Sequence, residues 1–432
     1  MIQAARVVLA AVVTAALLVV IAPPANAQTG AATGAAPTVL RAARLLDVRA
    51  GRIVNGGLIV VQDGKIVSVG GSAPPGARVI DLGDVTLAPG LIDLHTHLTM
   101  DIEGNWVMRE VTEGAADAAL RGARNARATV EAGFTTVRNL GSADFTDIAL
   151  ARAINAGFVP GPRIVSAGHS IGVTGGHCDT TGFAPGLMER DWRTGVADGP
   201  DEAQKAVRYQ IKHGALVIKI CATAGVLSFE AAVGAQQMSA AEMTAVVEEA
   251  ARHGLRVAAH AHGTAGIKAA IRAGVTSIEH GSILDDEAIA LMKERGTYLV
   301  PTSYLADSIN KEALPPLIRA KAETVLPVAR ESLRKAIAAG VKVALGTDAA
   351  VITQGHNGRE LGVYVSLGMT PLQAVRSATT VAAEVLGVTD RGAIEAGMLA
   401  DIIAVRGDPL QDVKVFEQVR FVMVGGKVVL QR

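Results

Sequence analysis

The sequence predicts an α/β protein built on a (β/α)8 TIM-type barrel, with a small β-sandwich formed by the two ends of the chain. Its 432 residues, 50% of them hydrophobic, are enough for a barrel plus a satellite domain. Strand-like and helix-like stretches alternate through the middle of the chain, whereas both ends show strand patterns. We therefore expect a sandwich of residues 38–90 plus 395–432 and a barrel of residues 91–394.

The first residues have the pattern of a targeting segment. Arg6 precedes an uncharged, largely apolar run, residues 7–22, and a small-x-small motif follows at residues 25–27. This order is typical of a secretory signal peptide, here residues 1–27, followed by a disordered mature N-terminus at 28–37. The apolar run is shorter than the roughly 20 residues of a spanning helix, so we expect cleavage and no stable membrane insertion. The sequence thus predicts export, to the periplasm or out of the cell.

Eight runs in the middle of the chain have the composition of buried strands. Helix-like stretches between them, such as 202–214, 239–254 and 285–296, begin with Ser or Asp or end with Gly, as capped helices do. A Gly-rich insertion, residues 168–200, follows the third run and would join the loops of the active-site face. In the N-terminal part, "QDGK" at 62–65 predicts a tight hairpin turn. The expected barrel strands are residues 90–95, 134–140, 163–168, 216–222, 256–262, 276–281, 297–303 and 342–349.

Composition narrows the classes of partner. Lys plus Arg and Asp plus Glu both number 41, so no charge excess indicates nucleic acid, and 3% aromatic residues argue against base-stacking surfaces. Two cysteines, Cys178 and Cys221, are too few for a disulfide framework. An exported protein could form one bridge, but Cys221 lies in an expected strand and we expect free, buried thiols. A homo-oligomer is compatible with the sequence.

Metal-binding side chains stand at the C-terminal ends of the expected strands. His95 and His97 are two residues apart on the first strand, so both rings face one side and can reach one cation. Barrel geometry brings the strand ends together around one axis. Imidazole and carboxylate are ligands of zinc and similar ions. The remaining candidates are Lys219 on the fourth strand, His260 and His262 on the fifth, His280 on the sixth and Asp348 on the eighth.

Lys219 is unusual because it lies within an apolar strand, "LVIKICA". A buried lysine is costly unless it is paired. Among metal ligands, carbon dioxide can carboxylate its ε-amino group to a carbamate, whose two oxygens can bridge two cations. The alternative is an ordinary lysine that snorkels to the surface.

These motifs resemble the amidohydrolase superfamily over nearly the whole chain after the expected leader. The matching stretches are "APGLIDLHTH", Lys219 on the fourth strand, "HAHG", "IEHG", "GTDA" and the tail "GAIEAGMLADIIAV". The resemblance implies two divalent ions bridged by the N6-carboxylated Lys219, with Asp348 moving the proton. The ligands that it implies are His95, His97 and Asp348 for one ion, and His260 and His280 for the other.

Three further stretches are similar to the Xaa-Pro dipeptidase and N-acyl amino acid carboxypeptidase branch, which includes an ochratoxin-hydrolysing amidase. They are "TGGHCD", "KICATAGVLS" and "VAAHAHGTAG". In that branch the second histidine of "HAHG" contacts substrate, which assigns His262 to the α-carboxylate or the scissile carbonyl. His177 in the Gly-rich loop and Tyr304 after the seventh strand are further substrate candidates, with loop packing as the alternative for His177.

The sequence and the resemblance predict a binuclear metal-dependent amidohydrolase acting on C–N bonds of peptide-like or N-acyl amino acid substrates, ochratoxin-like amides among them. The enzyme would release a C-terminal amino acid. The imidazole and carboxylate ligands favour zinc. Two such ions would lower the pKa of a shared water, and Asp348 would act as general base and then as general acid. The alternatives are hydrolysis of a cyclic amide, such as an imidazolone or lactam, and metal binding without turnover.

Overall fold

The computed structural model describes residues 36–102, 104–230 and 232–432. The chain divides into residues 1–34 and 35–432, and the second unit is the one described below. The expected signal peptide, residues 1–27, and most of the expected disordered segment, 28–37, lie outside the described residues. Within the described residues, no helix combines the length and the hydropathy needed to cross a membrane.

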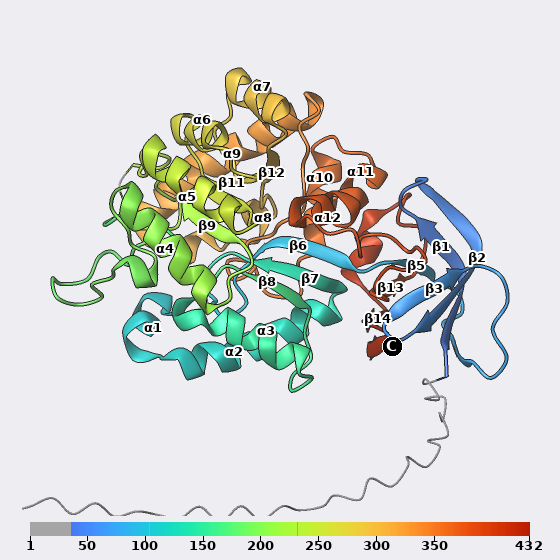
Figure 1. Cartoon of the computed structure of the whole chain (residues 1–432). Coiled ribbons are helices and arrows are strands. Elements are labelled where there is room, and N and C mark those ends of the chain that lie inside the picture. The colour runs from blue at the N-terminus through green and yellow to red at the C-terminus, as the bar shows by residue number, and fades with distance from the viewer. Residues whose placement is uncertain (1–35, 103, 231) are drawn as a thin grey trace, which may run out of the picture. The chain divides into compact units, whose positions relative to one another are not determined.

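Strands from both ends of this unit pair into one eight-stranded sheet (Figure 1). The ends meet where β5 pairs antiparallel with β13, with Ala88 opposite Ile403. The strand order is β15-β14-β13-β5-β1-β2-β3, and β4 pairs with β1. The domain boundaries stay a prediction. The strands are β1 (Thr38–Asp47), β2 (Arg52–Gln62), β3 (Lys65–Val69), β4 (Arg78–Asp81), β5 (Thr86–Pro89), β13 (Ile402–Val405), β14 (Phe421–Val424) and β15 (Lys427–Gln431).

The predicted hairpin at residues 62–65 is confirmed between β2 and β3. Its two central residues, Asp63 and Gly64, have φ angles of 50° and 78°. A type I′ hairpin turn requires positive φ at both central positions, which Gly adopts freely and Asp tolerates. The local sequence therefore determines this register.

The barrel segment consists of parallel strands in two short sheets, β6-β7-β8 and β9-β10-β11-β12. Each strand overlaps one of the first seven predicted runs. Side chains of these strands are almost all buried, which explains their continuous apolar composition rather than an alternating one. The strands are β6 (Leu91–Thr96), β7 (Phe134–Asn139), β8 (Arg163–Ser166), β9 (Ile218–Cys221), β10 (Val257–Ala261), β11 (Ser277–His280) and β12 (Tyr298–Val300).

The predicted eighth strand, 342–349, lies between β12 and β6 but does not form a regular strand. Isolated parallel bridges join Leu299 to Val343 and Thr96 to Ala349, and a further bridge joins Ile171 to Ile220 between the two sheets. The segments thus follow one another in a ring without a continuous ladder. The eighth segment is irregular where Asp348 adopts a φ of 57°, which no regular strand allows.

Helices follow the strands, and α2, α3, α5 and α6 pack on β7, β8, β10 and β11 (Figure 1). The three predicted helices are confirmed as α4, α5 and α7. Ser239 and Glu242 form a reciprocal capping box at the start of α5, and Gly214 and Gly296 end α4 and α7 with positive φ. The helices are α1 (Trp106–Thr112), α2 (Ala115–Glu131), α3 (Thr146–Asn155), α4 (Pro200–His213), α5 (Ala240–Arg252), α6 (Thr264–Ala273), α7 (Asp286–Arg295), α8 (Leu305–Ser308), α9 (Pro316–Ala338), α10 (Arg359–Ser366), α11 (Pro371–Ser377) and α12 (Thr380–Leu386).

The Gly-rich insertion leads from β8 to α4 and carries one disulfide. Cys178 in this loop is bonded to Cys221 on β9, with the two Cα atoms 5.8 Å apart. The expectation of free thiols is therefore wrong. The loop folds back along β9 through the bridge between Ile171 and Ile220, which brings two cysteines that are 43 residues apart to ordinary disulfide distance.

Candidate active site

The predicted metal-binding residues converge on one cavity of about 620 Å³ at the C-terminal ends of the barrel strands. β6 supplies His95 near its end, and His97 is the first residue after this strand. Lys219 lies within β9, whereas the other residues lie at or near strand ends or in loops. The predicted residues that line this cavity are His95, His97, His177, Lys219, His260, His262, His280 and Asp348.

His95, His97 and Asp348 form the first cluster of possible ligands. Oδ1 of Asp348 lies 3.6 Å from Nε2 of His95 and 3.5 Å from Nε2 of His97. Nδ1 of His97 lies 3.1 Å from the carbonyl oxygen of Gly141, and Nδ1 of His95 lies 2.9 Å from Glu279. A carbonyl and a carboxylate can only accept, so each Nδ1 carries the proton and each Nε2 offers its lone pair to the cavity.

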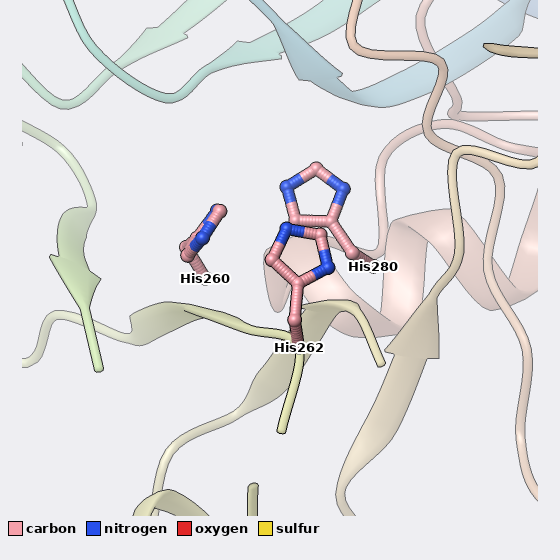
Figure 2. Close-up of side chains that lie close together, drawn as sticks. All are labelled: His260, His262 and His280. Atoms are coloured by element: carbon pink, nitrogen blue, oxygen red, sulfur yellow. The ribbon is translucent and has the colours of Figure 1, made fainter. Parts of the chain in front are cut away.

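His260, His262 and His280 form the second cluster, and their ligand atoms lie within 4.8 Å of one another. Figure 2 shows the three rings turned toward a common space. Nδ1 of His262 is bound to the Ser282 hydroxyl at 2.7 Å, and Nδ1 of His280 to the Thr302 hydroxyl at 2.8 Å. His262 therefore joins the two histidines that the resemblance assigns to the second ion.

The donor sets of both clusters fit divalent cations. Nε2 of His260 is buried and has no hydrogen-bond partner among the described residues. A buried orphan nitrogen is costly, and a metal ion would satisfy it. Burial also lowers the pKa of His97 to about 4 and of His262 to about 3, and it lowers the pKa of His95, His260 and His280 well below the usual value. These imidazoles are therefore neutral, as ligands must be.

Lys219 is 3% exposed and lies on β9, as the apolar strand pattern predicts. Burial lowers the pKa of its amine to about 8, although Glu279 and Asp348 oppose this shift. The lowered pKa increases the fraction of neutral amine, which is the form that can react with carbon dioxide. Burial raises the pKa of Asp348 to about 6, against the attraction of Lys219, so this carboxylate is a suitable base near neutral pH.

A buried ion pair of Arg138 and Glu279, which the sequence did not reveal, orients the ring of His95. Arg138 on β7 donates from Nη2 to Oε1 of Glu279 at 2.7 Å, and Oε2 of Glu279 accepts from His95. The guanidinium also donates to the Leu94 carbonyl and to Ser277. Arg138 and Glu279 thus form a salt bridge inside the barrel. An acidic residue inside the buried strand "SIEH" was the sequence feature that could have indicated a role for Glu279.

Asp93 is a second buried carboxylate that the sequence analysis missed. Its Oδ1 accepts from the backbone N–H groups of His95 and Thr347, at 3.0 and 3.1 Å. Its Oδ2 accepts from the Thr347 hydroxyl at 2.6 Å and from Asn357 at 2.7 Å. Asp93 thereby ties the first strand to the irregular eighth segment beside Asp348. The acid in "GLIDLH" was the signal.

The two weaker substrate candidates differ in position. The His177 ring stacks on His260, with ring centroids 4.0 Å apart and planes at 22°. Burial lowers the pKa of His177 to about 3. Tyr304 does not line the cavity: its backbone N–H donates to Glu360 and its hydroxyl accepts from Arg359 at 2.7 Å. The structure therefore brings His177, but not Tyr304, to the other candidates.

Several aromatic and aliphatic side chains form an apolar part of the cavity wall. Trp106 of α1 stacks on Phe229, with ring centroids 6.3 Å apart and planes at 21°. Phe183 of the Gly-rich loop, Leu314 just before α9 and Ile318 in its first turn line the same cavity. The chain has 13 aromatic residues of the Phe, Tyr and Trp types, and three of them line this wall. The wall offers an apolar surface to a bound molecule.

Comparisons with known proteins agree with this geometry. A sequence model of the amidohydrolase family matches residues 86–429. The ochratoxinase of Aspergillus niger is 36% identical over 429 residues, covering 92% of this chain and 88% of that protein. The crystal structure of a Xaa-Pro dipeptidase with bound methionine is 38% identical with a TM-score of 0.86, covering 91% and 99% of the two chains. A prolidase complexed with N-methylphosphonate-L-proline is 34% identical with a TM-score of 0.84, covering 92% and 100%. This chain therefore belongs to the amidohydrolase family and is a hydrolase of amide bonds.

Proposed function

We propose that the protein is a binuclear metal-dependent amidohydrolase that releases a C-terminal amino acid from peptide-like or N-acyl amino acid substrates. The observation that carries this proposal is the pair of three-residue donor clusters lining one cavity together with Lys219. The similarity to a Xaa-Pro dipeptidase and to an ochratoxinase supports a substrate of this kind.

In this proposal His95, His97 and Asp348 would hold one divalent ion, and His260 and His280 would hold the other. Lys219 would join them as its carbamate: the Nζ lone pair forms a bond to the carbon of carbon dioxide, and the amine loses one proton. When bound, the ions polarise the scissile carbonyl and lower the pKa of a water at the site. Zinc is the ion that the imidazole and carboxylate donors favour.

The residues of the chain then divide the remaining work. Asp348 accepts the proton of the attacking water and delivers it to the nitrogen of the leaving amino acid, as general base and then general acid. His262 lies in the second cluster and His177 stacks on His260, so either ring can reach a substrate that enters the cavity. Their depressed pKa values keep both imidazoles neutral, as hydrogen-bonding groups.

The apolar wall supports a preference on the acyl side of the amide. Trp106, Phe183 and Phe229 line the same cavity as the donor clusters. A flat or bulky apolar acyl group would bury its surface there, at about 25 cal/mol per Å². Ochratoxin-like amides and N-acyl amino acids with aromatic acyl groups fit this requirement.

The test is a hydrolysis assay on a library of dipeptides, N-acyl amino acids, lactams and imidazolones, with metal content measured on the same sample. We expect turnover of linear amides with a free α-carboxylate. Asp348→Asn should lower kcat by about 10²–10⁴-fold while metal stays bound. The exposed Asp286→Asn on α7 serves as control. The proposal would be overturned if metal-loaded wild-type protein hydrolysed none of these compounds. Turnover of cyclic amides alone would instead support the alternative of a cyclic amide hydrolase.

We also propose that the protein is exported, as its first residues predict. The Cys178–Cys221 disulfide supports this, because disulfides persist in oxidising compartments and are rare in the cytosol. Fractionation of cells that express the full chain tests it: we expect the protein, shortened at its N-terminus, outside the cytosol. Full-length protein confined to the cytosol would contradict the proposal.

A further inference from the structure

The disulfide lies in the wall of the candidate active site. Cys178 directly follows His177, and Cys221 is on β9, which also carries Lys219. Both cysteines line the cavity. The bond thus joins the segment that carries a histidine of the site to a strand that carries another of its residues.

Besides the disulfide, the loop around His177 has hydrogen bonds within the insertion and to the barrel. Thr174 is bonded to Asp198, and the Gly175 N–H donates to Asp179, all within the insertion. Toward the barrel, the His177 N–H donates to Oε1 of Gln237 at 2.9 Å. Glycines adjoin the histidine on its N-terminal side, at 175 and 176, and give the backbone wide freedom. The disulfide is therefore a major constraint on this segment.

The His177 ring fits a restricted position. It stacks on His260, and a Cβ atom added at Gly225 would lie 2.3 Å from its Nδ1 and Cε1 atoms. The ring occupies space that any residue other than glycine at 225 would fill. Its Nδ1 is buried without a hydrogen-bond partner among the described residues. Since no such bond holds Nδ1, the ring is positioned by its packing and by the backbone that carries it.

We propose that the Cys178–Cys221 disulfide is a positioning element of the active site, which holds His177 against His260 and makes full activity depend on the oxidised state. The proposal rests on the proposed function, in which these two histidines belong to the hydrolytic site. Breaking the bond lets the segment that carries His177, which glycines precede, move. A displacement of a group in the site by about 1 Å can lower the rate by a large factor.

A trialkylphosphine provides the test, because it reduces a disulfide without a competing thiol. The S–S bond breaks and two S–H bonds form with hydrogens from water, while phosphorus takes the oxygen and becomes the phosphine oxide. Thiol titration measures how much of the bond is broken. We expect reduction to lower kcat/KM of the metal-loaded enzyme about tenfold or more, with metal content unchanged.

A double comparison separates positioning from general loosening. If the disulfide acts through His177, reduction of the His177→Ala variant should change its kcat/KM by less than about twofold, because coupled sites are not additive. The Cys178→Ser/Cys221→Ser variant should match the reduced wild type and ignore the phosphine. An equal loss on reduction in wild type and His177→Ala would overturn the proposal.

Chemical modification provides a readout that needs no substrate. Diethylpyrocarbonate modifies accessible neutral imidazoles, and mass spectrometry locates them. We expect modification of His177 to rise on reduction, while that of His253, which is 43% exposed at the end of α5, stays constant as the internal control. Unchanged modification of His177 after the thiols appear would overturn the proposal. If no amide is hydrolysed, the proposed function fails, whereas this measurement still decides whether the disulfide holds the ring.

Discussion

Nδ1 of His95 lies 2.9 Å from Oε2 of Glu279, and both side chains are buried. The second oxygen of Glu279 accepts from Arg138, and a carboxylate oxygen accepts hydrogen bonds rather than donating them. His95 must therefore donate from Nδ1 and present Nε2 to the cavity. Carboxylate–histidine pairs of this kind fix the tautomer and raise the basicity of metal ligands.

Glu279→Gln should weaken metal binding. The amide oxygen can still accept from Arg138, which leaves the amide N–H₂ facing Nδ1 of His95 and favours the tautomer with a protonated Nε2. We expect metal affinity to fall about 10–100-fold, measured by competition with a coloured chelator. The exposed Glu248→Gln on α5 is the matched control. Equal affinities for the wild type and the Glu279→Gln variant would show that Glu279 does not support the ligand.

Trp106→Ala should change substrate preference rather than catalysis. Removing the indole opens the apolar wall and ends its stacking on Phe229. Aromatic contacts of this kind contribute about 0.5–1.5 kcal/mol. We expect KM to rise about threefold to tenfold for N-acyl amino acids with aromatic acyl groups, and little for N-acetyl amino acids. The second tryptophan of the chain provides the control, because Trp192 does not line the cavity. A rise that is equal for both substrate classes would contradict the assignment.

Local patterns explain what the sequence could predict. The hairpin at Asp63 and Gly64 and the capped start of α5 at Ser239 depend on neighbours a few residues away. The convergence of the histidines was also predictable, because each stands at the end of an apolar run and a barrel brings such ends together. Alternation along "HTH" already places His95 and His97 on one side.

Contacts between distant residues explain what the sequence could not predict. The pairing of Arg138 with Glu279 depends on which strands face each other across the barrel interior. The disulfide depends on how the Gly-rich loop folds back along β9, whereas the position of Cys221 in an apolar strand suggested free thiols. Asp348 has a positive φ and also lines the candidate active site. The expected regular strand is therefore interrupted at the residue that we propose to carry the proton.

Metal removal should destabilise the protein. Without ions, the donor clusters keep buried neutral imidazoles whose ring nitrogens lack partners, such as Nε2 of His260. A ligand that binds only the folded state at 100 times its Kd adds about 2.7 kcal/mol to the free energy of unfolding. We expect Tm to fall on chelation and to recover on addition of zinc, measured by circular dichroism.

The control for this prediction is the His95→Ala/His260→Ala variant, which loses a donor from each cluster. Its Tm should not respond to chelator or to zinc. Equal Tm values for chelated and zinc-loaded wild type would contradict a metal centre in this cavity.

Glu360 should make stability depend on pH away from the metal centre. It lies in α10, and its two oxygens accept from the backbone N–H groups of Ser303 and Tyr304, at 2.6 and 2.8 Å. Burial raises its pKa from 4.5 to about 8, so folding favours the protonated form. Its contribution to stability is complete below pH 4.5 and is lost as the pH rises through about 8. Relative to Glu360→Gln, which cannot titrate, the free energy of unfolding of the wild type should fall by about 1 kcal/mol per pH unit between pH 6 and 8, measured by urea unfolding.

The control is Glu287→Gln on α7. Hydrogen bonding to Lys268 lowers the pKa of Glu287, so the difference in free energy of unfolding between this variant and the wild type should stay constant over this range. A constant difference for Glu360→Gln as well would show that Glu360 is already ionised at pH 6.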